Sequence, residues 1–320
     1  MGSATGTWPF VSVVVPAYNA AKTIAACLES LTAQDYPGDR REIIVVDNNS
    51  SDATAAIAAR YPVRLIHERG RQSSYAARNR GLEAARGELV AFTDADCVAQ
   101  PDWLSRLVDG YEDETVGAFA GRVAAWEPQT VLEQFAERRR QVSNDASMAC
   151  SFLPYAMTAN VAYRRQLLEA LGGFDALLIS GGDADLSWRL QLNGGKSIRF
   201  NRAAVVHHKH RSSLRSFWRQ HWMYGYGTAM LYERYPGYRK SLGVETTYWA
   251  KRVSRFLIRG LSRIVRWPVR RGEGRVYFAE HFLEIICTTA RYLGLVQCAR
   301  SRRRTSATGR AAAEVAHAVR

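Results

Sequence analysis

The sequence lacks the features that mark three common classes of protein. Its five cysteines, among 320 residues, are scattered and form no Cys-x-x-Cys pair. This argues against a zinc site or a disulfide framework and indicates a reducing compartment. There is no run of about 18 apolar residues, so we expect no transmembrane helix. The first ten residues contain no basic segment and precede only a short apolar run, so we expect no signal peptide.

Acidic residues are scarce in the last part of the chain. Residues 251–320 contain 16 Lys or Arg and 4 Asp or Glu, a balance of +12, whereas the whole chain carries +14. Such a region suits an anionic membrane surface or a nucleic acid. No recognised nucleic-acid module accompanies it, so we expect no nucleic acid among the partners. Apolar residues recur at helical spacing over 251–271 and 278–296, which predicts either membrane-associated helices or surface helices packed on the domain.

Short apolar runs alternate with helix-like stretches in the first third of the chain. Strands are predicted at 10–16, 42–47, 63–68 and 88–94, with helices at 19–34, 51–61, 74–87 and 100–112. Later elements are predicted as strands near 116–125 and 197–206 and a helix at about 183–193. Asn19 is the expected N-cap of the first helix. This alternation predicts an α/β fold, with a mixed, mostly parallel sheet, helices on both faces and ligands beyond the carboxyl ends of the strands.

The stretch "LVAFTDADCV" (89–98) places two carboxylates at the end of a predicted strand. Alternation along a strand puts Asp94 and Asp96 on one face, about 6–7 Å apart. Two like charges at that spacing are unfavourable unless a cation lies between them, and a divalent cation with oxygen ligands is the natural candidate. The alternative is a solvated strand exit with an Asx turn.

Five segments occur in a fixed order along the chain: "VSVVVPAYNA", "IIVVDNNSSDAT", "AARNRGLEAARGELVAFTDADC", "TANVAYRRQLLEALGGFD" and "GGDADLSWRL". Together they resemble the inverting nucleotide-sugar glycosyltransferases of family 2, which have the Rossmann-like GT-A fold. The resemblance covers roughly residues 9–230. The predicted parts are a catalytic domain at 1–230 (donor half about 9–115, acceptor half about 116–230), an amphipathic, membrane-associating helical region at 231–300 and a basic flexible tail at 301–320.

The resemblance implies a donor site at the carboxyl ends of the first strands. Asp47 would accept hydrogen bonds from a nucleobase or a ribose. Arg78 would face the diphosphate because its planar fork fits phosphate, and the alternative is a surface arginine. Asn48 stands where the family more often has a second Asp, and we expect only turn chemistry there. The implied donor residues are Pro16, Ala17, Tyr18, Asp47, Arg78, Asp94 and Asp96.

The pair Asp94 and Asp96 matches the DxD motif of the family, which implies bound Mn²⁺ or Mg²⁺. His208, in "VVHHKHRSS" (205–213), would complete the metal site. A neutral imidazole suits Mn²⁺ better than Mg²⁺. The alternative for His208 is a histidine at the end of a strand with no ligand.

The resemblance also implies residues on the acceptor side. Asp183 would be the general base that takes the proton of the acceptor hydroxyl. The alternative is an acidic residue that merely suits the start of a helix. Asp185 would bind the acceptor or organise the site, and Asn160 would contact the acceptor. The ring of Trp222, in an aromatic stretch at 217–227, would stack on an acceptor sugar, and the alternative is a packed aromatic helix. The family usually has Glu where Gly182 stands, which puts a neighbouring acceptor contact in doubt.

We therefore expect a metal-dependent inverting glycosyltransferase on the cytoplasmic face of the cell membrane. It would move a sugar from a nucleotide donor, by family habit a UDP-sugar, to a glycan or lipid-linked acceptor in cell-envelope or exopolysaccharide synthesis. Gln220 is followed by Met223 and Tyr224, so the Gln-x-x-Arg-Trp element of processive relatives is absent and transfer of a single sugar is expected. The alternative is a catalytically silent binding or scaffold protein of the same fold at the membrane.

Overall fold

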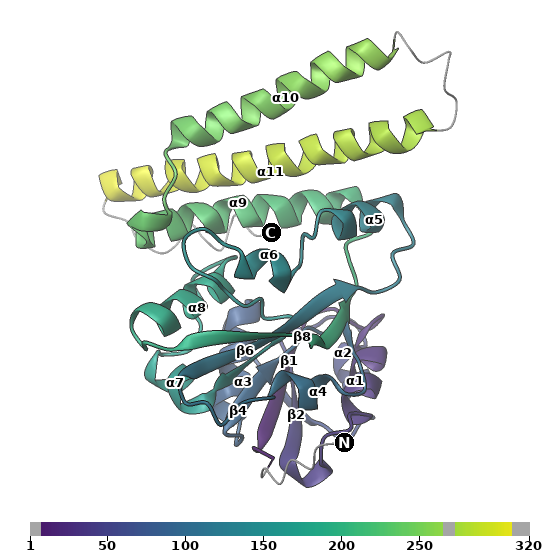
Figure 1. The fold of residues 1–320 in the computed structure, drawn as a ribbon, viewed down its shortest axis with the longest axis vertical. Helices are drawn as coiled ribbons and strands as arrows, with labels where there is room; N and C mark the ends of the chain where they lie inside the picture. Colours follow the sequence, from purple (N-terminus) through teal and green to yellow (C-terminus); the bar gives the residue numbers. More distant parts are fainter. Residues whose placement is uncertain (1–7, 265–272, 309–320) are drawn as a thin grey trace. The chain divides into compact units, whose positions relative to one another are not determined.

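The computed structural model describes residues 8–264 and 273–308, and the chain divides into two compact units (Figure 1). The first, here the sheet unit, runs to Leu178 and continues with Gly182–His210. The second, the helical unit, comprises Ile179–Gly181 and the chain from Arg211 onward. The boundary at His210 lies earlier than the end of the predicted catalytic domain at residue 230.

One mixed sheet of eight strands forms the centre of the sheet unit, in the order β3-β2-β1-β4-β7-β6-β8-β5. The strands are β1 (Val11–Ala17), β2 (Arg41–Asp47), β3 (Arg64–His67), β4 (Leu89–Phe92), β5 (Cys97–Ala99), β6 (Val116–Ala125), β7 (Val161–Arg164) and β8 (Ser197–His208). β1 runs parallel to β2 and β4, β2 to β3, and β6 to β8. β7 runs antiparallel to β4 and β6, and β5 to β8. The predicted mixed, mostly parallel sheet is confirmed, although β5 and β7 escape prediction.

Helices cover both faces of this sheet because its central strands are apolar on both faces. The helices of this unit are α1 (Ile24–Thr32), α2 (Thr54–Ala58), α3 (Ser74–Ala84), α4 (Trp103–Leu107), α5 (Val131–Arg138), α6 (Asn144–Met148), α7 (Arg165–Ala170) and α8 (Gly182–Leu192), with the 3₁₀ turn η1 (Gly38–Arg40). Val13 and Val15 of β1 pack with Leu28 of α1 in the main core. Val14, on the other face, lies against Gly81 of α3. Alternation along β1 thus joins α1 and α3 to opposite faces of one strand.

The loop after β1 differs from its prediction. Asn19 has a φ of +48°, so it is not the N-cap of the first helix, and α1 begins at Ile24. The Asn19 side chain instead accepts a hydrogen bond from the backbone N–H of Ser51 at 2.8 Å. Its own N–H donates to the Ser50 hydroxyl at 3.0 Å. Asn19 therefore ties the loop after β1 to the loop after β2.

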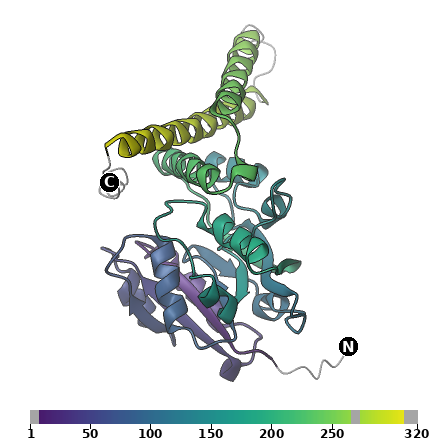
Figure 2. The same ribbon diagram turned by 90° about the vertical axis from the view of Figure 1, so that its left-hand side faces the viewer.

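Three long helices dominate the helical unit: α9 (Leu214–Arg234), α10 (Leu242–Ile264) and α11 (Glu273–Thr308), with the 3₁₀ turn η2 (Pro236–Tyr238). α9 and α11 pack closely (Figures 1 and 2). A Cβ atom on Gly225 would lie 1.8 Å from the carbonyl oxygen of Arg291, so only glycine permits this approach. Trp249 of α10 stacks on Tyr292 of α11, with ring centroids 5.0 Å apart.

The predicted basic C-terminal region is helical wherever the structure describes it. The predicted flexible tail from residue 301 is helical as far as Thr308, and its later residues lie outside the described part of the chain, as do residues 265–272 of the predicted amphipathic stretch. Among the residues that the structure describes, no helix has both the length and the apolar character needed to cross a bilayer.

Candidate active site

Parallel pairing brings the carboxyl ends of several strands to one edge of the sheet. Ala17, at the end of β1, lies beside Asp47 of β2, and Asp47 lies beside His67 of β3. β4, the other parallel neighbour of β1, ends just before Asp94. The predicted donor residues at this edge are Pro16, Ala17, Tyr18, Asp47 and Asp94.

Asp47 is a buried carboxylate beside His67. Asp47 is only 5% exposed, and its Oδ2 lies 3.3 Å from Nδ1 of His67. No described residue makes a hydrogen bond with Oδ1. A buried carboxylate oxygen without a donor is unfavourable, so this geometry suits a ligand with an N–H or O–H group. His67 escapes prediction, and its only signal in the sequence is its place at the end of the third strand.

Asn48, the next residue, binds the backbone of the loop between β3 and α3. Its amide nitrogen donates to the carbonyls of Glu68 and Arg71, at 3.0 and 2.8 Å, and its Oδ1 accepts from the N–H of Ser73 at 2.9 Å. Ser73 is the N-cap of α3. The turn role predicted for Asn48 therefore agrees with these contacts.

A short antiparallel pairing brings Asp96 and His208 together. Cys97, the first residue of β5, pairs with His208, the last residue of β8. Asp96 Oδ1 and His208 Nε2 are 3.6 Å apart, and one ligand atom from each of Asp94, Asp96 and His208 lies within 4.8 Å of the others. Two carboxylates and one imidazole form a donor set that suits Mn²⁺. The predicted metal residues thus converge, and they fit a divalent cation.

Arg78 of α3 supplies positive charge beside these acids. It is 4% exposed, and its Nη2 lies 2.5 Å from Oδ1 of Asp94. Its Nε has no hydrogen-bond partner among the described residues. A guanidinium stays charged when buried, so Arg78 offsets part of the carboxylate charge and keeps one donor for an anion. The alternative of a surface arginine is wrong.

Asp183 lies in the first turn of α8, where the helix dipole favours a negative charge. Its Oδ1 accepts from the N–H of Ala184 at 3.0 Å. Burial raises the pKa of Asp183 and the charge of Asp94 raises it further, while the charge of Arg78 opposes the shift. Asp183 therefore senses both Arg78 and Asp94, and a carboxylate with a raised pKa is a better proton acceptor than a solvated one.

Comparison with known proteins adds to this geometry. Residues 12–172 match the family model described as glycosyl transferase family 2. The chain belongs to glycosyl transferase family 2. The glycosyltransferase AglE of Haloferax volcanii is 36% identical over 213 residues, which cover 65% of this chain and 69% of that relative.

Two further similarities extend the comparison. The β-monoglucosyldiacylglycerol synthase of Synechocystis is 28% identical over 274 residues, which cover 79% of this chain but only 54% of that relative. The mannosyltransferase PcManGT from Pyrobaculum calidifontis, solved in complex with GDP-Man and Mn²⁺, has a TM-score of 0.54 and 24% identity, and the match covers 98% of this chain and 79% of that one. The predicted family, GT-A fold and enzyme class are confirmed.

This glycosyltransferase departs from the usual family motif at Gly182, and the structure shows what fills the space. The Tyr75 hydroxyl of α3 accepts a hydrogen bond from the N–H of Gly182 at 2.8 Å. A Cβ atom at position 182 would lie 2.7 Å from Cζ of Tyr75. The Tyr75 ring stacks on Phe174, with centroids 5.8 Å apart. Position 182 has no room for a side chain while Tyr75 keeps this place.

Asp185 is fully buried and forms an ion pair with Arg189 of the same helix. Its Oδ2 accepts from Nε of Arg189 at 2.9 Å. The Arg189 guanidinium also donates to the carbonyls of Leu171 and Gly173, at 2.6 and 2.7 Å. Of the two predicted roles for Asp185, these contacts support the one that organises the site, because the pair anchors α8 to the segment after α7.

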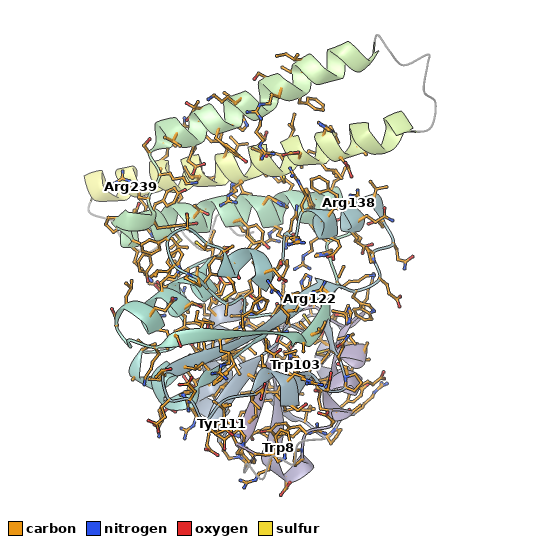
Figure 3. All side chains as sticks on the ribbon, viewed as in Figure 1. Trp8, Trp103, Tyr111, Arg122, Arg138 and Arg239 are labelled. Atoms are coloured by element: carbon orange, nitrogen blue, oxygen red, sulfur yellow. The ribbon has the colours of Figure 1, made fainter. Side chains whose placement is uncertain are left out.

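Asn160 is a correction to the predicted acceptor site. The residue is 0% exposed, and its Oδ1 accepts from the indole N–H of Trp103, labelled in Figure 3, at 2.8 Å. Its Nδ2 donates to the carbonyls of Arg122 and Ala204 at 2.8 and 2.9 Å. Asn160 thus links α4, β6 and β8 in the interior, and it offers no surface to an acceptor.

Trp222 lies in the helical unit, on α9. Its indole N–H donates to Oε1 of Gln297 in α11 at 3.3 Å, and its ring lies 5.3 Å from that of Tyr226. These contacts are those of the packed aromatic helix that was the alternative to an acceptor role. Contact between Trp222 and an acceptor stays a prediction.

Proposed function

We propose that this protein is a metal-dependent inverting glycosyltransferase that moves a single sugar from a nucleoside-diphosphate donor to a glycan or lipid-linked acceptor. The observation that carries the proposal is the convergence of Asp94, Asp96 and His208 beside buried Arg78, with Asp183 electrostatically coupled to the same group. By family habit the first donor to test is a UDP-sugar. GDP-mannose is the second, because the Pyrobaculum mannosyltransferase was solved with that donor.

In the proposed reaction, the acceptor hydroxyl transfers its proton to the Asp183 carboxylate. The hydroxyl oxygen then forms a bond to the anomeric carbon of the donor sugar. The bond from that carbon to the diphosphate oxygen breaks, and its electron pair leaves with the nucleoside diphosphate. Attack from the face opposite the leaving group inverts the anomeric centre, and one positioned base suffices for this displacement.

The other residues bind and orient the donor. Asp47 Oδ1 accepts a hydrogen bond from the base or the ribose, and Arg78 Nε donates to the diphosphate. A divalent cation held by Asp94, Asp96 and His208 would, when bound, neutralise charge that develops on the leaving diphosphate. A binding protein of the same fold would need no proton acceptor such as Asp183, so the geometry favours the enzyme.

The helical unit supports a membrane-proximal acceptor. Val244, Tyr248, Lys251, Arg255 and Ile258 recur at helical spacing on α10, so they share one face, and all five are exposed. Ile258 is 67% exposed. A face with apolar and cationic side chains suits an anionic lipid surface. The Synechocystis relative is named for a glycolipid product. We place the enzyme peripherally on the cytoplasmic membrane face, in cell-envelope or exopolysaccharide synthesis.

A donor panel tests the proposal. Release of nucleoside diphosphate is measured for UDP-glucose, UDP-N-acetylglucosamine, UDP-galactose, GDP-mannose and dTDP-glucose, with and without Mn²⁺, on the wild-type protein and on Asp96→Ala. We expect one donor to be preferred, with a rate that depends on Mn²⁺ and is lost in Asp96→Ala. Asp102→Ala, which removes an acidic residue paired with Arg106 outside the metal group, is the matched control. No release from any donor under any metal would reject the proposal.

A further inference from the structure

We propose that Tyr75 is a positioning residue for Asp183, because its hydroxyl and ring fix the first turn of α8 relative to Arg78 and Asp94. The inference rests on the proposed role of Asp183 as general base and adds a residue to that machinery. It concerns Tyr75 and Gly182, which lie 107 positions apart in the chain but 2.8 Å apart between the hydroxyl oxygen and the backbone nitrogen.

Gly181, the residue that precedes α8, has no side chain that could cap the helix. Helices usually begin with Ser, Thr, Asp or Asn, whose oxygen accepts one of the unpaired N–H groups of the first turn. Here Gly181 and Gly182 precede Asp183, and Gly181 has a φ of +82°. Tyr75, a residue of α3, performs this task instead: its hydroxyl accepts the N–H of Gly182. The turn that carries the base is thus held by another helix.

The same helix also holds the segment that leads to α8. Asn79 donates from Nδ2 to the carbonyl of Phe174 at 2.7 Å and accepts the N–H of Phe174 at Oδ1 at 2.8 Å. The Tyr75 ring stacks on the Phe174 ring, with an interplanar angle of 17°. Both ends of the segment from Phe174 to Gly182 are therefore bound to side chains of α3.

The metal side of the site is attached to α3 as well. Arg78 follows Tyr75 by one helical turn, and its guanidinium carbon lies 5.8 Å from the Tyr75 ring centroid. The same guanidinium is bound to Asp94. One helix, α3, thus contacts both an acid of the metal group and the turn that carries Asp183. This arrangement constrains the position of Asp183 relative to Arg78 and Asp94, and an error of about 1 Å in the spacing of reacting groups can cost about 100-fold in rate.

Tyr75→Phe in the full-length protein tests the role. The variant keeps the ring and its stacking but removes the oxygen that binds Gly182. We measure release of nucleoside diphosphate with Mn²⁺ and the donor that the panel selects, with water in the place of the acceptor. The expected result is a kcat about tenfold lower, with the KM for the donor changed less than about twofold. Tyr36→Phe is the matched control, since it removes another buried tyrosine hydroxyl, bound to the Pro9 carbonyl at 2.6 Å.

The double variant Tyr75→Phe/Asp183→Asn separates positioning from general support of the fold. If Tyr75 acts through Asp183, the double variant releases the nucleotide as fast as Asp183→Asn alone. An additional tenfold loss in the double variant, a wild-type kcat in Tyr75→Phe, or a loss equal to that of Tyr36→Phe would overturn the positioning role.

The outcomes also distinguish this inference from the proposed function. A wild-type rate in Asp183→Asn would refute the proposed base, and the positioning role would fall with it. An inactive Asp183→Asn together with a fully active Tyr75→Phe would leave the proposed function intact and refute only the role of Tyr75.

Discussion

The two units of this chain differ in net charge and in whether their charged side chains are buried. Residues 1–210 contain 22 Lys or Arg and 24 Asp or Glu, whereas residues 211–320 contain 22 and 6. In the sheet unit, charged side chains are buried near the carboxyl ends of strands: Asp47 is buried at the end of β2, and buried Arg78 is bound to Asp94. In the described part of the helical unit, cationic side chains such as Lys251 and Arg255 remain exposed beside exposed apolar ones.

This difference suggests separate roles for the two units in polar-ligand binding and in membrane association. Burying an ionised group is expensive unless it is paired or meets a ligand, so a cluster of buried charges indicates a site built for polar ligands. Exposed apolar and cationic residues on one helix face cost little in water and gain free energy at an anionic lipid surface. This contrast supports the proposal that the sheet unit binds the donor and carries out the transfer, and that the helical unit associates with the membrane. The predictions below test this division.

The largest effect is expected for Asp183→Asn in the sheet unit. The amide cannot accept the proton of the acceptor hydroxyl, so we expect kcat to fall about 1,000-fold while the donor still binds. Because burial raises the pKa of Asp183, the acid limb of the wild-type kcat/KM profile should lie above the usual range of an aspartate, with activity lost as pH falls through it. A kcat within tenfold of wild type would contradict the assignment.

A second large effect is expected for His208→Gln. Loss of the imidazole should weaken Mn²⁺ activation about 100-fold and reduce the preference for Mn²⁺ over Mg²⁺. The measurement is the Mn²⁺ and Mg²⁺ dependence of nucleotide release. His207→Gln is the control, because this neighbour on β8 lies against the carbonyl of Ala125. Equal metal dependence in the two variants would show that His208 is no ligand.

A smaller effect is expected in the helical unit. Lys251→Glu/Arg255→Glu should weaken binding to vesicles that contain phosphatidylglycerol about tenfold or more, since each basic residue near such a surface contributes about 1 kcal/mol. Arg60→Glu/Arg80→Glu changes the net charge equally, on exposed residues of the sheet unit, and should leave more of the binding intact. Vesicle co-sedimentation measures both. Equal losses would indicate that net charge, not the α10 face, determines association.

The smallest effect concerns stability. The raised pKa of Asp183 means that the folded state binds its proton more tightly than the unfolded state does. The contribution of this group to the free energy of unfolding therefore falls as pH rises through that pKa, and its ionised form costs stability at neutral pH. Asp183→Asn should raise Tm at pH 7, and the gain should shrink as pH falls towards 4. Thermal melts across this range would contradict the account if the gain grew towards low pH.

The parts of the fold and site that depend on local pattern could be predicted from the sequence. Apolar runs ending in polar residues locate β1, β2 and β4, and parallel pairing then places Asp47 and Asp94 at one edge. The close spacing of Asp94 and Asp96 indicates a cation because neighbouring carboxylates repel each other. The cluster with His208 agrees with that reasoning. The predicted placement on one strand face is wrong, since β4 ends at Phe92 and both residues lie in the segment between β4 and β5.

The features that escaped prediction depend on contacts between distant segments. β5 has three residues and forms only against β8, and its pairing is what brings His208 to Asp96. Asparagine is usually exposed, but Asn160 is buried, and its hydrogen-bond partners come from α4, β6 and β8. Tyr75 lies in a predicted helix, but its contact with Gly182 joins residues 107 positions apart. No local pattern encodes these partners.

Equilibrium binding of Mn²⁺ in the presence of the preferred donor tests the central claim most directly. We would titrate Mn²⁺ into wild type, Asp96→Ala and Asp183→Asn and follow free Mn²⁺ by electron paramagnetic resonance. The account predicts one donor-dependent Mn²⁺ per chain in wild type and in Asp183→Asn, and none in Asp96→Ala. Binding in Asp96→Ala equal to wild type would contradict it, because the two carboxylates at the end of β4 would then not hold the metal.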